Sequence, residues 1–153
     1  MKLSIQYVAG LFDGEGWFTI ARMKGSHYRA RREWAYQCRA SLVLKDEFIV
    51  KALHHQYGGA FREQKKRSDN HADYYIWVAT GLNALNFAEQ VSSELHIKRP
   101  QANVLIDFQK QKNNQGNRPL SDGVYDFYGE CFGQMKHLNQ KGVARNTSHI
   151  GEK

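Results

Sequence analysis

The spacing of apolar residues changes along this chain, and the changes predict the order of its elements. Helical spacing over residues 4–13, with Ser4 as a suitable N-cap, predicts a first helix. Aromatic and β-branched residues then favour a strand over residues 16–24, and regular alternation predicts a second strand over residues 34–44. Helical spacing returns over residues 45–58 and predicts a second helix.

The following segment continues with strands and then with helices. A hairpin is predicted from strands over residues 60–67 and 73–79. Helices are predicted from Thr80, which can act as a cap, from Pro100, which suits a first helical turn, and over residues 125–138. The predicted order is therefore αββαββ followed by C-terminal helices.

This order predicts an α+β fold in which helices back one face of a four-stranded antiparallel sheet. A polar loop is expected over residues 113–117. Because no linker separates the two αββ halves, we expect one domain over residues 1–140. The remaining residues, 141–153, are expected to form a disordered tail.

Composition indicates which partners the protein can have. The 153 residues carry a net charge of +7, which favours a polyanionic partner such as nucleic acid, although a solvated basic surface without a partner is the alternative. Cys38 and Cys131 are too few for a disulfide framework or a zinc site, so we expect reduced thiols. We find no secretory signal and no apolar run of about 20 residues. We therefore expect an intracellular protein in a DNA-containing compartment, without a membrane partner.

One segment, residues 7–16, carries the strongest chemical signal, with the sequence Tyr-Val-Ala-Gly-Leu-Phe-Asp-Gly-Glu-Gly. The small Ala9 and Gly10 would let another helix approach closely, and the two glycines beside Glu15 would give the backbone conformational freedom. A plain turn is the alternative, because Asp-Gly-Glu-Gly is a common turn composition. The whole segment resembles the motif of the LAGLIDADG homing endonucleases, specifically those with a single motif per chain.

The resemblance implies a metal site and a homodimer. The last acid of the family motif binds the catalytic metal, which implies that Glu15 and the carbonyl group of Gly14 bind Mg²⁺ or Mn²⁺. A duplex has two scissile phosphates, so two chains would pair their first helices through Ala9 and Gly10. Asp13 would then cap the partner's helix. In the alternative interpretation, Ala9 and Gly10 merely contact this chain's own sheet.

Two lysines are further candidates for the active site. Lys98 enters the segment Gln-Ala-Asn at the start of a helix, which resembles the segment of homodimeric relatives whose lysine lies in the active site. The resemblance implies that Lys98 polarises the scissile phosphate or positions the attacking water; an ordinary surface lysine is the alternative. Relatives often end the second strand with a polar residue that orders solvent. Here Leu44 is followed by Lys45, so Lys45 is the candidate.

Polar residues on the outward positions of the predicted sheet would contact DNA, because a twisted β-ribbon fits the major groove. The choice of rows assumes that Phe61 and Ile76 point inward, and Arg22 and Lys24 would need a bulge or an early strand end to reach the outer face. The resemblance implies that Arg62 and Gln64 match base-contacting positions. The candidates are Thr19, Arg22, Lys24, Arg29, Arg31, Arg32, Gln37, Arg39, Ser41, Arg62, Gln64, Lys66, Asp73, Tyr75 and Trp77.

The expected activity is that of a homodimeric, metal-dependent, site-specific endonuclease that cuts both strands of a long, nearly palindromic DNA site. Similar enzymes are encoded in introns. Two alternatives remain at this level: an RNA-splicing maturase that binds intron RNA, and a DNA-binding protein that does not cleave. Tyr75 and Trp77, if exposed, would permit RNA binding, since they could stack on bases.

Overall fold

The computed structural model describes residues 2–25, 32–65 and 73–140. The elements follow the order α1 (Ile5–Glu15), β1 (Gly16–Lys24), β2 (Trp34–Leu44), α2 (Glu47–Tyr57), β3 (Ala60–Gln64), β4 (Tyr74–Thr80), α3 (Gly81–Val91), the 3₁₀-helix η1 (Ser92–Glu94), α4 (Arg99–Gln115) and α5 (Asp122–Leu138). This order confirms the predicted α+β fold. The predicted disordered tail lies outside the described residues.

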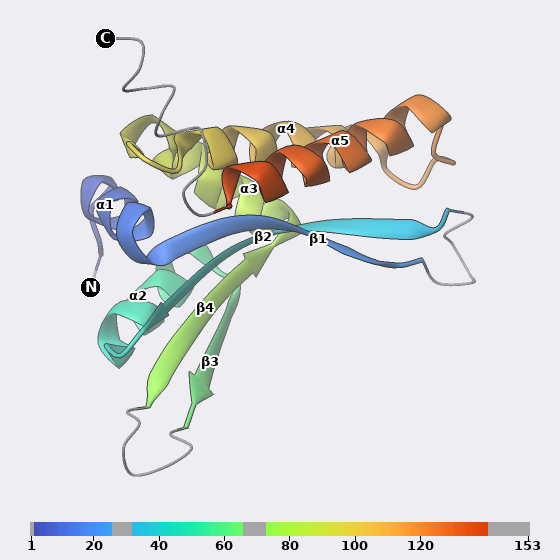
Figure 1. Ribbon diagram of the computed structural model, residues 1–153. Helices are drawn as coiled ribbons and strands as arrows, with labels where there is room; N and C mark the ends of the chain where they lie inside the picture. Colours follow the sequence, from blue (N-terminus) through green and yellow to red (C-terminus); the bar gives the residue numbers. More distant parts are fainter. Residues whose placement is uncertain (1, 26–31, 66–72, 141–153) are drawn as a thin grey trace, which may run out of the picture.

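The described strands form one sheet in the order β1-β2-β4-β3, and each neighbouring pair is antiparallel. The β1–β2 and β3–β4 hairpins point in different directions, and the described helices lie on one side of the sheet, with α4 and α5 running along the β1–β2 hairpin (Figure 1). In the described part of the chain, the other side of the sheet is not covered by a helix. We call this second side the open face.

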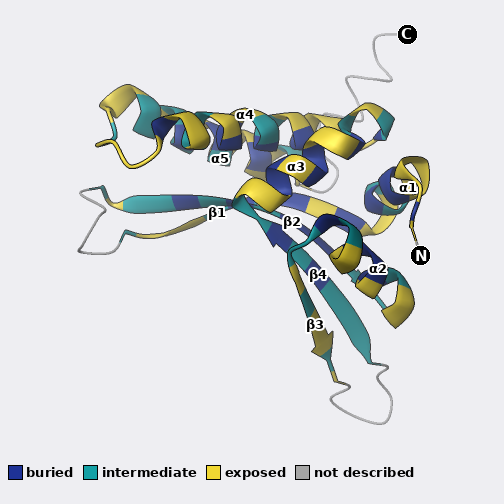
Figure 2. Ribbon diagram, turned by 180° about the vertical axis from the view of Figure 1, so that it is seen from behind, coloured by how far each residue is buried: buried dark blue, intermediate teal, exposed yellow. Residues whose placement is uncertain are grey.

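The core lies between the sheet and the helices, where Figure 2 shows most of the buried positions. Aromatic side chains dominate it, with ring centroids 4.9 Å apart for Phe12 and Phe87 and 4.8 Å apart for Trp77 and Phe87. The indole N–H of Trp77 donates to the carbonyl group of Gly58 at 2.8 Å, so its polar atom is paired. This cluster joins α1, β4 and α3 and fixes the end of α1 against the sheet.

The predicted outward row of β4 is wrong. Leu42 pairs with Trp77 and Ala40 with Ala79, so the buried row of β2 faces Trp77, which is completely buried. Tyr75 lies on the same side and stacks on Phe61. Every residue from Tyr74 to Val78 is apolar or aromatic, so alternation could not identify the inner row, and the strand register decides it. Asp73 was predicted to face outward because it belongs to the same row as Tyr75 and Trp77, so the register removes the reason for that prediction.

Two smaller differences concern the C-terminal helices. Residues 113–115, predicted as a loop, belong to α4, where the Gln109 amide donates to Asn113 Oδ1 at 2.9 Å and supports the helix. The helix ends at Gly116, whose φ of 58° favours glycine. No helix among the described residues is long and apolar enough to span a bilayer. Both cysteines are free thiols, and both are buried.

Candidate active site and nucleic-acid interface

Glu15 is the last residue of α1, and β1 begins directly after it. Its side chain is exposed, and within the described residues it makes no hydrogen bond or ion pair. An unpaired carboxylate at this position is free to bind a cation. The carbonyl ends of α1 add partial negative charge there, which disfavours a carboxylate and attracts a positive ion.

Gly16 has a different role from the one predicted. Its φ is −89°, which any residue can adopt, and Gly14 is also without a positive φ. A Cβ atom on Gly16 would instead lie 2.5 Å from the ring of Phe12. The glycine is therefore required by the close approach of the first residue of β1 to a core side chain, and it lets α1 turn into the sheet without a loop.

Asp13 caps a helix of its own chain, whereas the sequence predicted that it would cap a partner's helix. Its carboxylate accepts hydrogen bonds from the backbone N–H groups of His96 at 2.8 Å, Ile97 at 3.1 Å and Lys98 at 3.0 Å. These groups lie immediately before α4, which has no other side-chain cap. A carboxylate at a helix N-terminus satisfies free donors and complements the helix dipole.

Lys98 comes to the same end of α1 as Glu15. Its ammonium group donates to the carbonyl oxygen of Phe12 at 3.0 Å and also to that of Gly16. The structure thus brings together two residues that are 83 positions apart in the chain. Arg99, the neighbouring cation, points elsewhere and donates to the carbonyl groups of Ser92 and Ser93.

The donor set at this end of α1 fits a divalent cation that shares its ligands with a substrate. The described residues contain no cluster of three or more metal-binding side chains. Mg²⁺ prefers oxygen ligands and keeps several waters, so Glu15 and the carbonyl group of Gly14 could hold it together with phosphate oxygens. Lys45 is exposed and follows β2, whose Leu42 pairs with Gly16, so it lies near the same end of the sheet.

The exposed face of α1 carries small residues, although not the pair predicted. Ala9 is completely buried in this chain's own core, so its predicted place in a dimer interface is wrong. Gly10 and Gly14 are exposed, and a Cβ atom on either would meet nothing within 4 Å. Tyr7, 48% exposed, lies on the same face of the helix. The two glycines and the tyrosine leave a face on which another helix can approach closely.

On the open face, the predicted β2 and β3 rows are largely found. Gln37 and Arg39 alternate with the buried row of β2, and Arg39 Nε donates to Gln37 Oε1 at 3.2 Å. Arg62 is exposed and pairs across the strands with Ile76. Gln64 and Thr19 share this face and are half-buried. Each of these side chains can donate hydrogen bonds to a bound ligand.

Ser41 is the exception on β2. Its register partners are Trp17 and Val78, and it is only 4% exposed. This burial does not support the prediction that Ser41 contacts DNA.

The cations of β1 lie on the helix side of the sheet. The register between β1 and β2 is unbroken, so the bulge that would turn Arg22 and Lys24 outward is absent. The Arg22 guanidinium lies 4.1 Å from the ring centroid of Trp34 and 4.7 Å from that of Phe132. Lys24 lies 4.8 Å from the same Trp34 ring and 3.4 Å from Glu33. Both cations therefore contact aromatic rings behind the open face.

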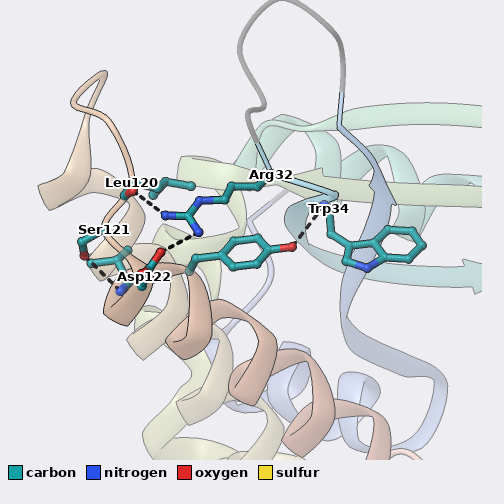
Figure 3. A network of polar contacts seen from close by, with 7 residues as sticks. Arg32, Trp34, Leu120, Ser121 and Asp122 are labelled. Atoms are coloured by element: carbon teal, nitrogen blue, oxygen red, sulfur yellow. Dashed lines mark hydrogen bonds and ion pairs between the residues drawn. The ribbon is translucent and has the colours of Figure 1, made fainter.

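Arg32 is tied to the start of α5 (Figure 3). It forms an ion pair with Asp122 at 2.7 Å and donates to the carbonyl group of Leu120 at 2.9 Å. The Tyr125 hydroxyl in turn accepts from the backbone N–H of Trp34 at 3.2 Å. The predicted phosphate contact by Arg32 is replaced by a structural one. The other predicted residues of this turn, Arg29 and Arg31, lie outside the described residues, as does Lys66.

Sequence reasoning overlooked two features of the interface. Gly14 was assigned only to the metal, although its spacing from Gly10 already places both on one helix face. Trp17 and Met23 lie on the same outward row of β1 as Thr19, but the neighbouring cations Arg22 and Lys24 were assigned to DNA instead. In both cases simple periodicity was the available signal.

The sequence profile of the LAGLIDADG endonuclease family matches residues 8–88, which include most of α1, the sheet, α2 and most of α3. The match covers more than half of the chain, so this protein belongs to the LAGLIDADG endonuclease family. The predicted family is thereby confirmed. No curated protein sequence matches the chain.

Solved structures of homing endonucleases share the fold. I-CvuI, crystallised with the I-CreI target in the presence of Mg, superposes with a TM-score of 0.71 at 18% identity, covering 97% of this chain and 92% of that chain. I-TnaI gives a TM-score of 0.68 at 18% identity and 99% coverage of both chains. I-SmaMI, bound to cleaved DNA, gives 0.62 at 17% identity, and 99% of this chain matches 48% of that chain.

Proposed function

We propose that this protein is a site-specific double-strand DNA endonuclease that acts as a homodimer with Mg²⁺ or Mn²⁺. The observation that carries the proposal is the exposed, unpaired carboxylate of Glu15 at the end of α1, at the margin of a sheet whose open face presents Arg39 and Arg62. Membership of an endonuclease family supports it. We further propose that the enzyme works in an intracellular compartment that contains DNA.

Glu15 and the carbonyl group of Gly14 would hold the metal ion. When bound, the ion supplies an activated water near neutral pH and neutralises charge at the attacked phosphate. Lys98 keeps the carbonyl groups of Phe12 and Gly16 in place, so it holds the backbone that presents Glu15. The Lys98 ammonium also donates to the carbonyl group of Gly16, the residue after Glu15, which supports a role in polarising the phosphate. Lys45 remains the candidate for ordering solvent.

A homodimer would supply the second active site. Gly10 and Gly14 leave room for a second copy of α1, and Tyr7 can cover the contact. Ile97, 54% exposed, lies beside Asp13, to which its N–H donates, and can extend the apolar surface. The likeness to I-SmaMI supports this arrangement, since that longer chain matches this one over only half of its length.

The side chains of the open face would contact the base edges of the duplex. Arg39 and Arg62 carry the donors that match guanine, and Gln37 and Gln64 those that match adenine. The net charge of +7 complements the phosphates. The RNA alternative rested on exposed Tyr75 and Trp77, but Trp77 is completely buried and Tyr75 stacks on Phe61. DNA is therefore the polymer that this surface fits.

The decisive experiment replaces Glu15 by Gln. A randomised duplex library would first be enriched for bound sequences in Ca²⁺, and the enriched duplexes would then be incubated with Mg²⁺. We expect E15Q to bind these duplexes like the wild type and to lose cleavage at least 100-fold, because its amide cannot supply the negative charge that the ion requires. Glu130→Gln, an exposed change on α5, is the control that should cleave normally. Normal cleavage by E15Q would refute the metal role.

A further inference from the structure

The outward row of β1 is almost entirely apolar. Trp17, Thr19, Ala21 and Met23 alternate with the buried Phe18 and Ile20, and Met23 is 42% exposed. Met23 pairs across the strands with Ala35, and Ala21 pairs with Gln37. The Met23–Ala35 pair therefore presents a thioether side chain and a methyl group on the open face, and neither group can donate a hydrogen bond.

The cations on either side of Met23 lie too far round the strand to add a hydrogen-bond donor to the open face beside Met23. Arg22 is placed between the rings of Trp34 and Phe132, and Lys24 lies on the same Trp34 ring. Both belong to the opposite face of the hairpin, because the β1–β2 register has no bulge. Strand β1 thus turns its cations towards the helix side of the sheet and its largely apolar row towards the open face.

In the major groove, an apolar side chain favours one base over the others. Thymine presents a C5-methyl group there, whereas the remaining base edges present polar atoms that lose water against a thioether. We propose that Met23, with Ala21 and Ala35 beside it, recognises thymine methyl groups in the outer part of each half-site. This inference rests on the proposed function and names part of the sequence that the enzyme would select.

The position of the thymine follows from the strand. Met23 is eight residues beyond Glu15, or roughly 26 Å at about 3.3 Å per residue. That length corresponds to about eight base pairs at about 3.4 Å each. The methyl contact is therefore expected about eight base pairs from the cleaved phosphate, on both sides of the site.

The test measures affinity in Ca²⁺ for enriched duplexes in which each thymine is replaced singly by deoxyuridine, which lacks only the methyl group. We expect about fourfold weaker binding at the outer position, the loss that one unburied methyl group gives. Met23→Gln should abolish the difference between thymine and deoxyuridine there. Met23→Leu, which keeps an apolar side chain, should retain it. Because Met23 is exposed, thermal unfolding of both variants should match the wild type.

Equal affinity for thymine and deoxyuridine at every position would overturn the inference while leaving the proposed endonuclease intact. So would a Met23→Gln variant that still prefers the methylated base. If the wild type selects no sequence from the library, the proposed function fails, and the inference fails with it. Retention of the preference by Met23→Leu alone supports the contact.

Discussion

The side chains of Asp13 and Lys98 form reciprocal hydrogen bonds, each to a backbone group of the other residue or of its neighbour. The carboxylate of Asp13 accepts the N–H of Lys98 at 3.0 Å, and the Lys98 ammonium returns to the carbonyl group of Phe12 at 3.0 Å, one residue before Asp13. The C-terminus of α1 and the N-terminus of α4 are thereby joined by complementary charges at complementary helix ends. Since Glu15 follows two residues after Asp13, this junction fixes the backbone that presents the proposed metal ligand.

The first prediction concerns this junction. Asp13→Ala leaves three N–H groups before α4 without their acceptor, so we expect a loss of about 2 kcal/mol in the free energy of unfolding. Urea denaturation monitored by circular dichroism measures it. Glu15→Gln, which removes no contact among the described residues, is the control and should unfold like the wild type. Equal stability of D13A and the wild type would contradict the capping role.

The second prediction tests the exposed face of α1. Gly10→Leu should leave the monomer folded, because no atom lies within 4 Å of an added Cβ, but it should block the approach of a second α1. Light scattering after gel filtration should then give the mass of one chain. Gly133→Leu is a matched control, since Gly133 is also exposed and unobstructed in the middle of a helix, α5. A G10L protein that remains dimeric would place the interface elsewhere.

The third prediction separates a structural arginine from a DNA-contacting one. Arg32→Gln should leave the dependence of DNA affinity on salt unchanged, because Asp122 and the Leu120 carbonyl group already hold the guanidinium. Arg62→Ala should relax base preference at one position in each half-site. Binding titrations at several salt concentrations, with single-base variants of the enriched duplex, measure both effects. A shallower salt dependence for R32Q would show that Arg32 contacts phosphate.

The fourth prediction uses the two buried thiols. Burial raises the pKa of both Cys38 and Cys131 to about 11, from 9.0 for an unperturbed thiol. Below pH 9 both states keep the proton; between pH 9 and 11 the unfolded chain releases it first. Stability should therefore fall through this window, by on the order of 2 kcal/mol per thiol. The double variant Cys38→Ala/Cys131→Ala should show a smaller fall in urea denaturation, and an identical fall would contradict the assignment.

Local pattern was sufficient for most elements and insufficient for one strand. The bounds of β1 agree with the predicted strand because aromatic and β-branched residues favour it, and those of β2 agree because its residues alternate between two faces. In β4, five consecutive apolar or aromatic residues gave no alternation to follow, so its inner row depended on the register with β2. Once Leu42 faces Trp77, the whole row changes sides.

The candidate site divides in the same way. The motif around Glu15 identified the family and the candidate metal-binding acid, because a carboxylate beside small residues is a pattern of consecutive positions. Long-range contacts determine what Arg22, Arg32 and Asp13 bind. From the sequence alone, each charge could equally have contacted phosphate, a partner or another part of this chain. Each is held by groups between 12 and 110 positions away.

Order and identity of the elements, the positive charge and the acid proposed to bind metal thus follow from the chain alone, because they depend on near neighbours. Which cations remain available for DNA is set only when β1, α4 and α5 meet. An aromatic ring or a helix end can bind the same cation as phosphate does. These contacts lie within the chain, so they are present once it has folded.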